Sequence, residues 1–174
     1  MTRYTPTVAI AALSLLLASC VSAPPPPPPP PVDTTTPAQR LAAIEASGGA
    51  DDTELSVQPL RDPQVEDLRD SAKRKRAAGD LAGAAAALDQ ALQLVPEDPA
   101  LLQDRAELAL LLKDDAGAEA FAKRAIDLGS QTGPLCRRHW ATIEQSRLAR
   151  GQKENAASAH AHIEGCTVAG IKRY

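Results

Sequence analysis

Aromatic residues are almost missing from this chain of 174 residues, which contains one Trp, one Phe and two Tyr. Strands favour aromatic and β-branched side chains, so this scarcity argues against a sheet. Hydrophobic residues still make up 44% of the sequence, and Ala and Leu, which suit closely packed helices, are prominent among them. The composition therefore predicts an all-α protein, and the length leaves room for one modest domain.

Catalytic motifs are missing too. The chain has no GxSxG, no HExxH, no glycine-rich phosphate loop and no pair of carboxylates in a setting that would raise a pKa. We therefore expect no enzyme activity, no cofactor and no small-molecule substrate. The net charge of −3 is mild, and it favours neither nucleic acid nor anionic lipid as the main partner.

An apolar run covers residues 8–18, after the single cation Arg3. It is too short to span a bilayer, which takes about 20 residues, but it has the anatomy of a secretory signal peptide. The run ends in Leu17-Ala18-Ser19-Cys20, which resembles the lipobox of bacterial lipoproteins. The resemblance implies that residues 1–19 are removed and that Cys20 is acylated, with palmitate among the chains. The alternative is cleavage elsewhere, which would leave a periplasmic protein without an anchor.

The same resemblance implies a location. In bacterial lipoproteins, aspartate after the cysteine favours the inner membrane, whereas Val21 and Ser22 follow Cys20 here. This implies an anchor in the outer membrane that faces the periplasm. Eight prolines fill residues 24–31 of the lipidated linker, residues 20–36. They predict a disordered, stiff tether that spans about 25 Å in the polyproline II conformation, although such a run also binds aromatic-lined domains.

Residues 37–62 form a poorly defined segment between the linker and the helical region. The apolar pair Leu41 and Ile44 predicts a short helix over residues 37–47, ended by Gly48 and Gly49. Residues 54–60 are expected to be extended and to dock on the domain.

Helical periodicity begins after Asp62-Pro63, and two segments about 34 residues apart repeat one another. Large, small and turn positions recur in register: Leu68, Ala72, Gly79, Ala84, Leu88, Ala91 and Pro96 in the first segment, and Leu102, Ala106, Ala118, Ala122 and Ala125 in the second. The pairs Asp62-Pro63 and Asp98-Pro99 each predict a helix start.

A third, divergent segment predicts a longer first helix from about residue 133 to 150, a break at Gly151 and a second helix over about 153–164. The pattern over residues 63–166 resembles the tetratricopeptide repeat. That resemblance implies a solenoid of about three antiparallel helix hairpins, followed by a tail, residues 167–174. Leu68 and Lys75 fill slots that are aromatic in the family, and Trp140 fills a small slot. A generic antiparallel helical array is the alternative.

Cys136 and Cys166 each lie 15 residues from Gly151, so an antiparallel hairpin would bring them level. The oxidising periplasm predicts a disulfide between them. Two alternatives stay open. One is a zinc site formed by Cys136, His139, His162 and Cys166, because the spacings resemble those of zinc ligands, and the other is a pair of free thiols.

Three cations on one helix, Arg69, Lys73 and Arg76, fall on the concave surface that tetratricopeptide repeats use to hold peptides, so the resemblance implies a partner-binding groove. The matching slots of the later repeats hold Gln103, Glu107, Arg137 and Glu144. Such a groove would suit an acidic segment or a C-terminal carboxylate. The alternative is an ordinary solvated face.

Together these features predict an outer-membrane lipoprotein that serves as a non-enzymatic adaptor or scaffold for a periplasmic or outer-membrane protein. One rival is a thiol- or metal-dependent envelope protein that uses Cys136, Cys166, His139 and His162. Another is a structural lipoprotein without a dedicated partner.

Overall fold

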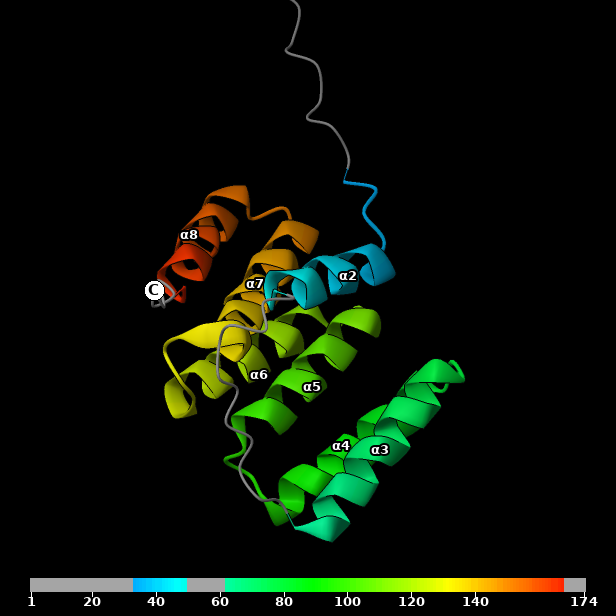
Figure 1. Cartoon of the computed structure of the whole chain (residues 1–174). Helices are drawn as coiled ribbons and strands as arrows, with labels where there is room; N and C mark the ends of the chain where they lie inside the picture. Colours follow the sequence, from blue (N-terminus) through cyan, green and yellow to red (C-terminus); the bar gives the residue numbers. More distant parts are fainter. Residues whose placement is uncertain (1–32, 50–61, 168–174) are drawn as a thin grey trace, which may run out of the picture. The chain divides into compact units, whose positions relative to one another are not determined.

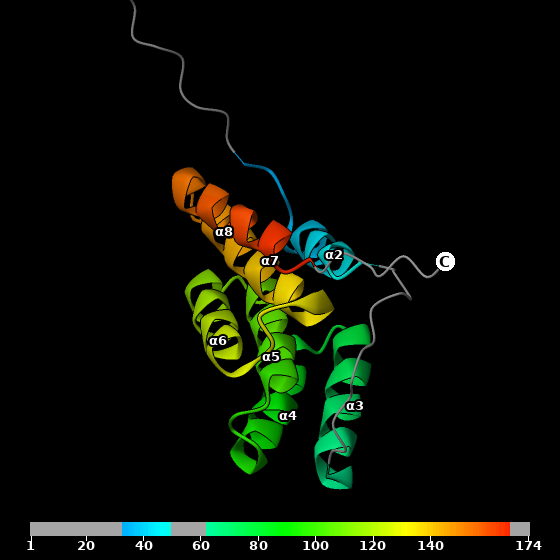
Figure 2. The same ribbon diagram turned by 60° about the vertical axis from the view of Figure 1, so that its left-hand side comes forward.

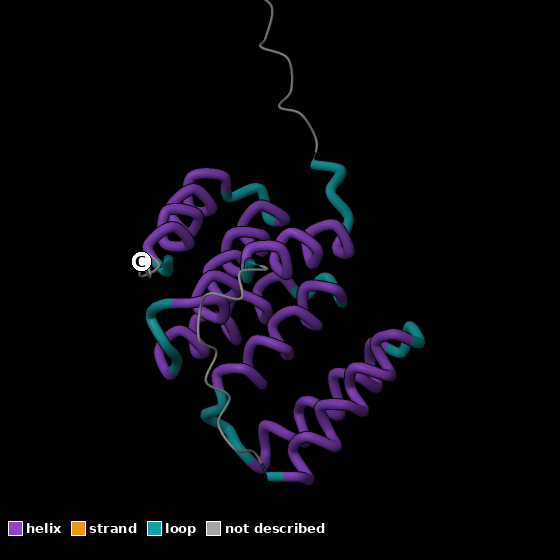
Figure 3. The backbone as a smooth tube through the Cα atoms, in the orientation of Figure 1, coloured by secondary structure: helices purple, strands orange, loops and turns teal. Residues whose placement is uncertain are grey.

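The computed structural model describes residues 33–49 and 62–167. Within these ranges the chain forms seven α-helices and no strand (Figures 1 and 3), which confirms the all-α prediction. The chain divides into residues 1–32 and residues 33–174, and every described helix belongs to the second unit. The predicted signal peptide, lipobox and proline tether lie outside the described residues. None of the described helices is long and apolar enough to cross a membrane.

Helix α2 covers Pro37–Ser47, which confirms the short helix predicted from the sequence. A capping box holds its start, because the Thr36 hydroxyl accepts from the Gln39 amide and the Gln39 side chain accepts from the Thr36 amide. The extended segment predicted for residues 54–60 lies outside the described residues.

Three helix hairpins follow α2, and each packs against the next. They are α3 (Pro63–Ala77) with α4 (Leu81–Leu94), α5 (Pro99–Leu111) with α6 (Asp115–Leu128), and α7 (Gly133–Ala149) with α8 (Lys153–Gly165). The predicted arrangement of three antiparallel hairpins stacked as a helical-repeat solenoid is therefore confirmed. The longer first helix of the third hairpin is also as predicted.

Aspartates begin the helices of the first two hairpins. Asp62 and Asp98 cap α3 and α5 ahead of a proline, as predicted. In the second helix of each hairpin the cap is Asp80 or Asp114, whose carboxylate accepts from the amide three residues later, at 2.8 Å and 2.9 Å. The third hairpin lacks such side-chain caps at both helix starts, so the capping pattern ends where the sequence diverges.

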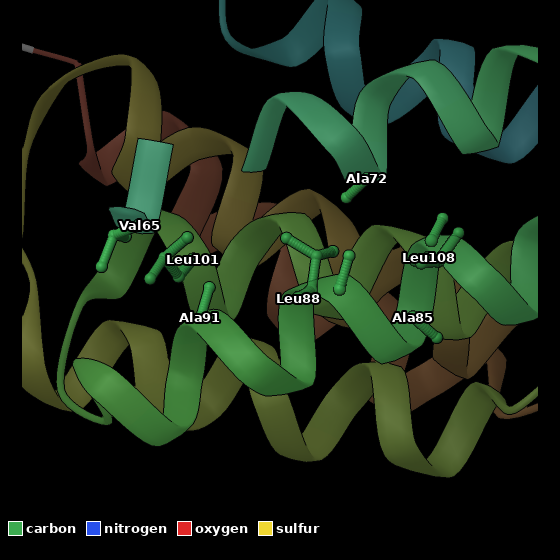
Figure 4. Close-up of a cluster of buried hydrophobic side chains, with 9 residues drawn as sticks. Val65, Ala72, Ala85, Leu88, Ala91, Leu101 and Leu108 are labelled. Carbon is green, nitrogen blue, oxygen red and sulfur yellow. The ribbon is translucent and has the colours of Figure 1, made fainter. Parts of the chain in front are cut away.

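Small side chains let the helices approach closely. In the cluster shown in Figure 4, Ala84, Ala91 and Leu101 are completely buried, and Leu88 is nearly so. Alanine at a helix crossing shortens the distance between axes, and neighbouring leucines fill the remaining space. A core with very few aromatic residues is therefore sufficient for this fold.

Ion pairs add a polar link between successive hairpins. Arg69 on α3 donates to Asp104 on α5, with Nε and Oδ2 2.5 Å apart. Arg147 on α7 donates to Glu119 on α6, with Nη2 and Oε1 2.9 Å apart. These side chains are mostly buried, so each pair helps to fix how one hairpin lies on the next.

The turn inside each hairpin needs a residue with positive φ. Gly79, Lys113 and Gly151 occupy this place with φ of 81°, 63° and 72°. A residue with a Cβ in this conformation destabilises the folded state by about 1 kcal/mol or more. Of the three hairpin turns, only the second has a residue with a Cβ at this place, Lys113.

Gly79→Ala is expected to lower the free energy of unfolding by about 1 kcal/mol. The matched control is Gly165→Ala at the last residue of α8, because an added Cβ meets nothing within 4 Å at either glycine, and only Gly79 has positive φ. Urea unfolding of both variants measures the difference. Equal effects of the two substitutions would contradict the argument from φ.

Candidate partner-binding groove

Helix α2 occupies part of the surface formed by the first helices of the hairpins. It packs on α7 and α5, on the side away from α6 (Figure 2). Ile44 is completely buried there, and Arg40, 5% exposed, donates to the backbone and side-chain oxygens of Gln145. The second and third hairpins therefore do not present an open groove, because this chain's own helix covers them.

Arg137 on α7 holds the end of α2. Its Nε donates to the Ser47 carbonyl at 3.0 Å, and its Nη2 donates to the Gly48 carbonyl at 2.7 Å. These two bonds satisfy carbonyls that a helix end leaves unpaired, and the positive charge suits the helix C-terminus. Arg137 thus acts as a clamp on α2.

Arg137→Ala is expected to make the amides of α2 exchange with solvent about tenfold faster, because the helix loses two charge-assisted hydrogen bonds. Arg124→Ala is the control, since it removes an exposed bond of similar length, 3.0 Å to the Pro96 carbonyl, far from α2 in the sequence. Hydrogen-exchange mass spectrometry should place the change in residues 37–47. Unchanged exchange there would show that α2 does not depend on this clamp.

A pocket of about 220 Å³ remains beside α2, where the first hairpin meets α5 and α7. Its lining combines apolar and charged side chains: Glu45, Arg69, Ala72, Lys73, Arg76, Ala84, Leu88, Asp104, Glu107, Leu108 and Arg138. The alanines and leucines in this set are almost completely buried. The charged side chains therefore form the rim of the pocket, and the apolar side chains form its inner wall.

The cations of the pocket differ in how well they are paired. Arg69 is bound to Asp104, and Arg138 donates from two nitrogens to Glu107. Among the residues that the structure describes, Arg76 has only long contacts, 3.7 Å from Nη2 to Oε1 of Glu45 and 4.0 Å from Nη1 to Oε2 of Glu107. Both exceed hydrogen-bond distance, so Arg76 keeps most of its donor capacity.

A buried polar network lies between α5 and α7. The Gln103 amide nitrogen donates to Glu107 Oε1 at 2.9 Å and to Thr142 Oγ1 at 2.8 Å. The Gln103 amide oxygen must then accept from His139, whose Nδ1 lies 2.7 Å away. This fixes the histidine tautomer and leaves Nε2 as a buried acceptor without a hydrogen-bond partner in the described part of the chain.

Burial shifts the pKa of both titratable groups in this network. It lowers the pKa of His139 from 6.5 to about 4, and the nearby charge of Arg138 acts in the same direction. It raises the pKa of Glu107 above 4.5, against the opposing effects of Arg138 and the hydrogen bond from Gln103. His139 is therefore neutral in the folded protein at neutral pH.

The chain is similar to a solved domain of another protein. No protein-family model and no curated protein matches the chain. A solved structure does: the globular C-terminal domain of LpoP from P. aeruginosa is 30% identical to it and superposes with a TM-score of 0.58. The match covers 60% of this chain and 99% of that domain. The chain belongs to the LpoP family. Since LpoP is a lipoprotein, the match agrees with the lipoprotein predicted from the sequence.

The structure gathers some of the predicted groove residues in this LpoP-family domain and separates others. Arg69, Lys73, Arg76 and Glu107 surround the pocket. Gln103 is buried in the network, Arg137 clamps α2, and Glu144 Oε1 lies 3.0 Å from His160 Nδ1 on α8.

Sequence reasoning missed three charged lining residues, Glu45, Asp104 and Arg138. Glu45 lies on α2, whose docking site no repeat pattern specifies. Asp104 follows Gln103 in the sequence, and Arg138 follows Arg137. Both could have been found from their charge, because each is opposite in sign to a predicted groove residue on the facing helix. Arg69 pairs with Asp104, and Glu107 pairs with Arg138.

The cysteine pair of the LpoP-family domain lies where the hairpin geometry predicts. Cys136 and Cys166 are disulfide-bonded, with Cα atoms 5.8 Å apart. The histidines proposed to join them in a zinc site point elsewhere: His139 faces Gln103, and His162 stacks on Trp140 with ring centroids 4.0 Å apart. Within residues 33–49 and 62–167, no group of three or more His, Cys, Asp or Glu side chains is placed to hold a metal ion.

Proposed function

We propose that this chain is an outer-membrane lipoprotein whose helical domain binds a protein in the periplasm, without catalysing a reaction. The observation that carries the proposal is the likeness to the LpoP domain, at 30% identity over 99% of its length. The solved domain is the C-terminal part of LpoP. In this chain, too, the helical domain lies on the C-terminal side, after the lipobox-like motif and the prolines.

The surface beside α2 supports a binding role. Stacked helix hairpins, here in a tetratricopeptide-like register, create extended concave surfaces that suit protein binding. In this domain α2 covers part of that surface and leaves the pocket at the first hairpin, with Lys73 and Arg76 at its rim. The adaptor would act from an anchor at Cys20, at the end of the proline tether.

A photo-crosslinking amino acid placed at Lys73 in living cells tests the binding role. The control position is Lys123 on α6, because the two side chains are 57% and 55% exposed and each pairs with an acid on its own helix. We expect a discrete crosslinked protein from position 73 and none from position 123. Equal products from both positions, or none from position 73, would contradict a partner site at the pocket.

A further inference from the structure

Because α2 packs on α5 and α7, a partner that approaches this concave surface meets the pocket at the first hairpin. We propose that this pocket holds two neighbouring side chains of an internal segment of the partner, an aliphatic residue inserted into the pocket and a Glu or Asp bound by Arg76. The proposal rests on the proposed function and specifies the chemistry of its partner.

The size and floor of the pocket favour one inserted side chain. Its volume of about 220 Å³ falls below the roughly 300 Å³ at which small-molecule sites begin. The inner wall is apolar, formed by Ala72, Ala84, Leu88 and Leu108. An aliphatic side chain that enters this space loses its hydration and gains apolar contacts on several sides.

The acidic residue of the partner is inferred from which cations of the pocket already pair with a carboxylate. Arg69 and Arg138 already hold carboxylates, whereas within residues 33–49 and 62–167 Arg76 makes only the two long contacts with Glu45 and Glu107. A guanidinium binds a carboxylate through two parallel hydrogen bonds, and the Arg76 side chain is 39% exposed. Lys73 lies one turn earlier on α3 and adds positive charge at the same rim.

Helix α2 limits how much of the partner is recognised. Glu45 lines the pocket from α2, and α2 packs across α5 and α7. A peptide that follows the concave surface beyond the first hairpin would have to displace Ile44 and break the bonds from Arg137. Recognition is therefore confined to a pair of side chains at the first hairpin.

The test uses two blocked dipeptides, acetyl-leucyl-glutamic acid amide and acetyl-leucyl-glutamine amide, titrated into the acylated full chain in detergent and followed by NMR. We expect the acidic probe to shift the amides around the pocket and to saturate in the millimolar range. The neutral probe should bind about fivefold more weakly, since it lacks the charged hydrogen bonds. Equal binding of both probes, or shifts that avoid α3 and α5, would overturn the proposal.

Two arginine variants assign the effect to one side chain. Arg76→Gln should weaken the acidic probe about fivefold and leave the neutral probe unchanged, whereas Arg74→Gln, an exposed cation of the same helix outside the pocket, should leave both unchanged. If both variants weakened binding of the acidic probe equally, the overall charge of α3 would explain the effect, and the proposal would be overturned. Urea unfolding checks that each variant is folded.

The crosslinking experiment separates this inference from the proposed function. A discrete product from position 73 together with no preference for the acidic probe would leave the partner site standing and reject its proposed chemistry. Loss of the position-73 product would instead remove the proposed function, whatever the dipeptides do.

Discussion

Reduction of the disulfide between Cys136 and Cys166 is expected to lower the free energy of unfolding by about 3.5 kcal/mol. The bond closes a loop between residues 30 apart in sequence, and on the chain-entropy model a closed loop of this length restricts the unfolded chain by about that amount. The effect is large for a small array of three hairpins, because in such an array each hairpin makes most of its contacts with its neighbours. Urea unfolding with and without dithiothreitol measures it.

The control for this measurement is the double variant Cys136→Ala/Cys166→Ala. It should match the reduced wild-type chain to within about 1 kcal/mol, since both sulfurs are buried and their removal leaves only small cavities. It should also show no response to dithiothreitol. A wild-type chain whose stability changes by less than 1 kcal/mol on reduction would contradict a stabilising role for the disulfide.

Acidification from pH 7 to pH 4 is expected to remove about 3 kcal/mol of stability through His139 alone. Burial and Arg138 lower the pKa of this ring from 6.5 to about 4 in the folded protein. As the pH falls below 6.5, His139 becomes protonated in the unfolded chain but stays neutral in the folded chain. The free energy of unfolding therefore falls until the pH reaches the pKa of His139 in the folded protein. The contribution of His139 is thus complete above pH 6.5 and lost near pH 4.

Glu107 acts in the opposite direction. Its pKa is raised above 4.5 in the fold, so the folded chain binds a proton more tightly than the unfolded chain does. This contribution to stability is lost as the pH rises.

The variant His139→Asn isolates the effect of the histidine, because it keeps a donor for Gln103 and removes the titration. Urea unfolding at pH 7 and pH 4 should show a difference about 3 kcal/mol smaller in the variant. Equal pH dependence of both proteins would contradict a neutral buried His139.

Local sequence signals were enough to predict the helices. The Asp-Pro pairs at residues 62–63 and 98–99 and the residues Gly79 and Gly151 mark starts and turns through backbone chemistry that acts over a few residues. The helix Pro37–Ser47 was predicted for the same reason. The spacing of Cys136 and Cys166 about Gly151 then predicted which positions come level.

The surface of the site could not be predicted in the same way. Where α2 docks depends on contacts with residues about 90 to 105 positions away, such as those of Ser47 with Arg137 and of Arg40 with Gln145, and no local pattern encodes them. Periodicity placed Gln103 and Glu107 on the concave face, but these side chains are buried because α7 covers them with Arg138 and Thr142. The groove expected from the repeat is thus reduced to a pocket.

The central claim is that this LpoP-family domain works from a lipid anchor, and the intact mass of the protein purified from membranes without reductant tests it most directly. We expect the mass of residues 20–174 plus acyl chains, short by the two hydrogens lost in forming the disulfide. The same chain without acyl groups, or with residues 1–19 still attached, would contradict the anchor at Cys20 and with it the proposed adaptor at the outer membrane.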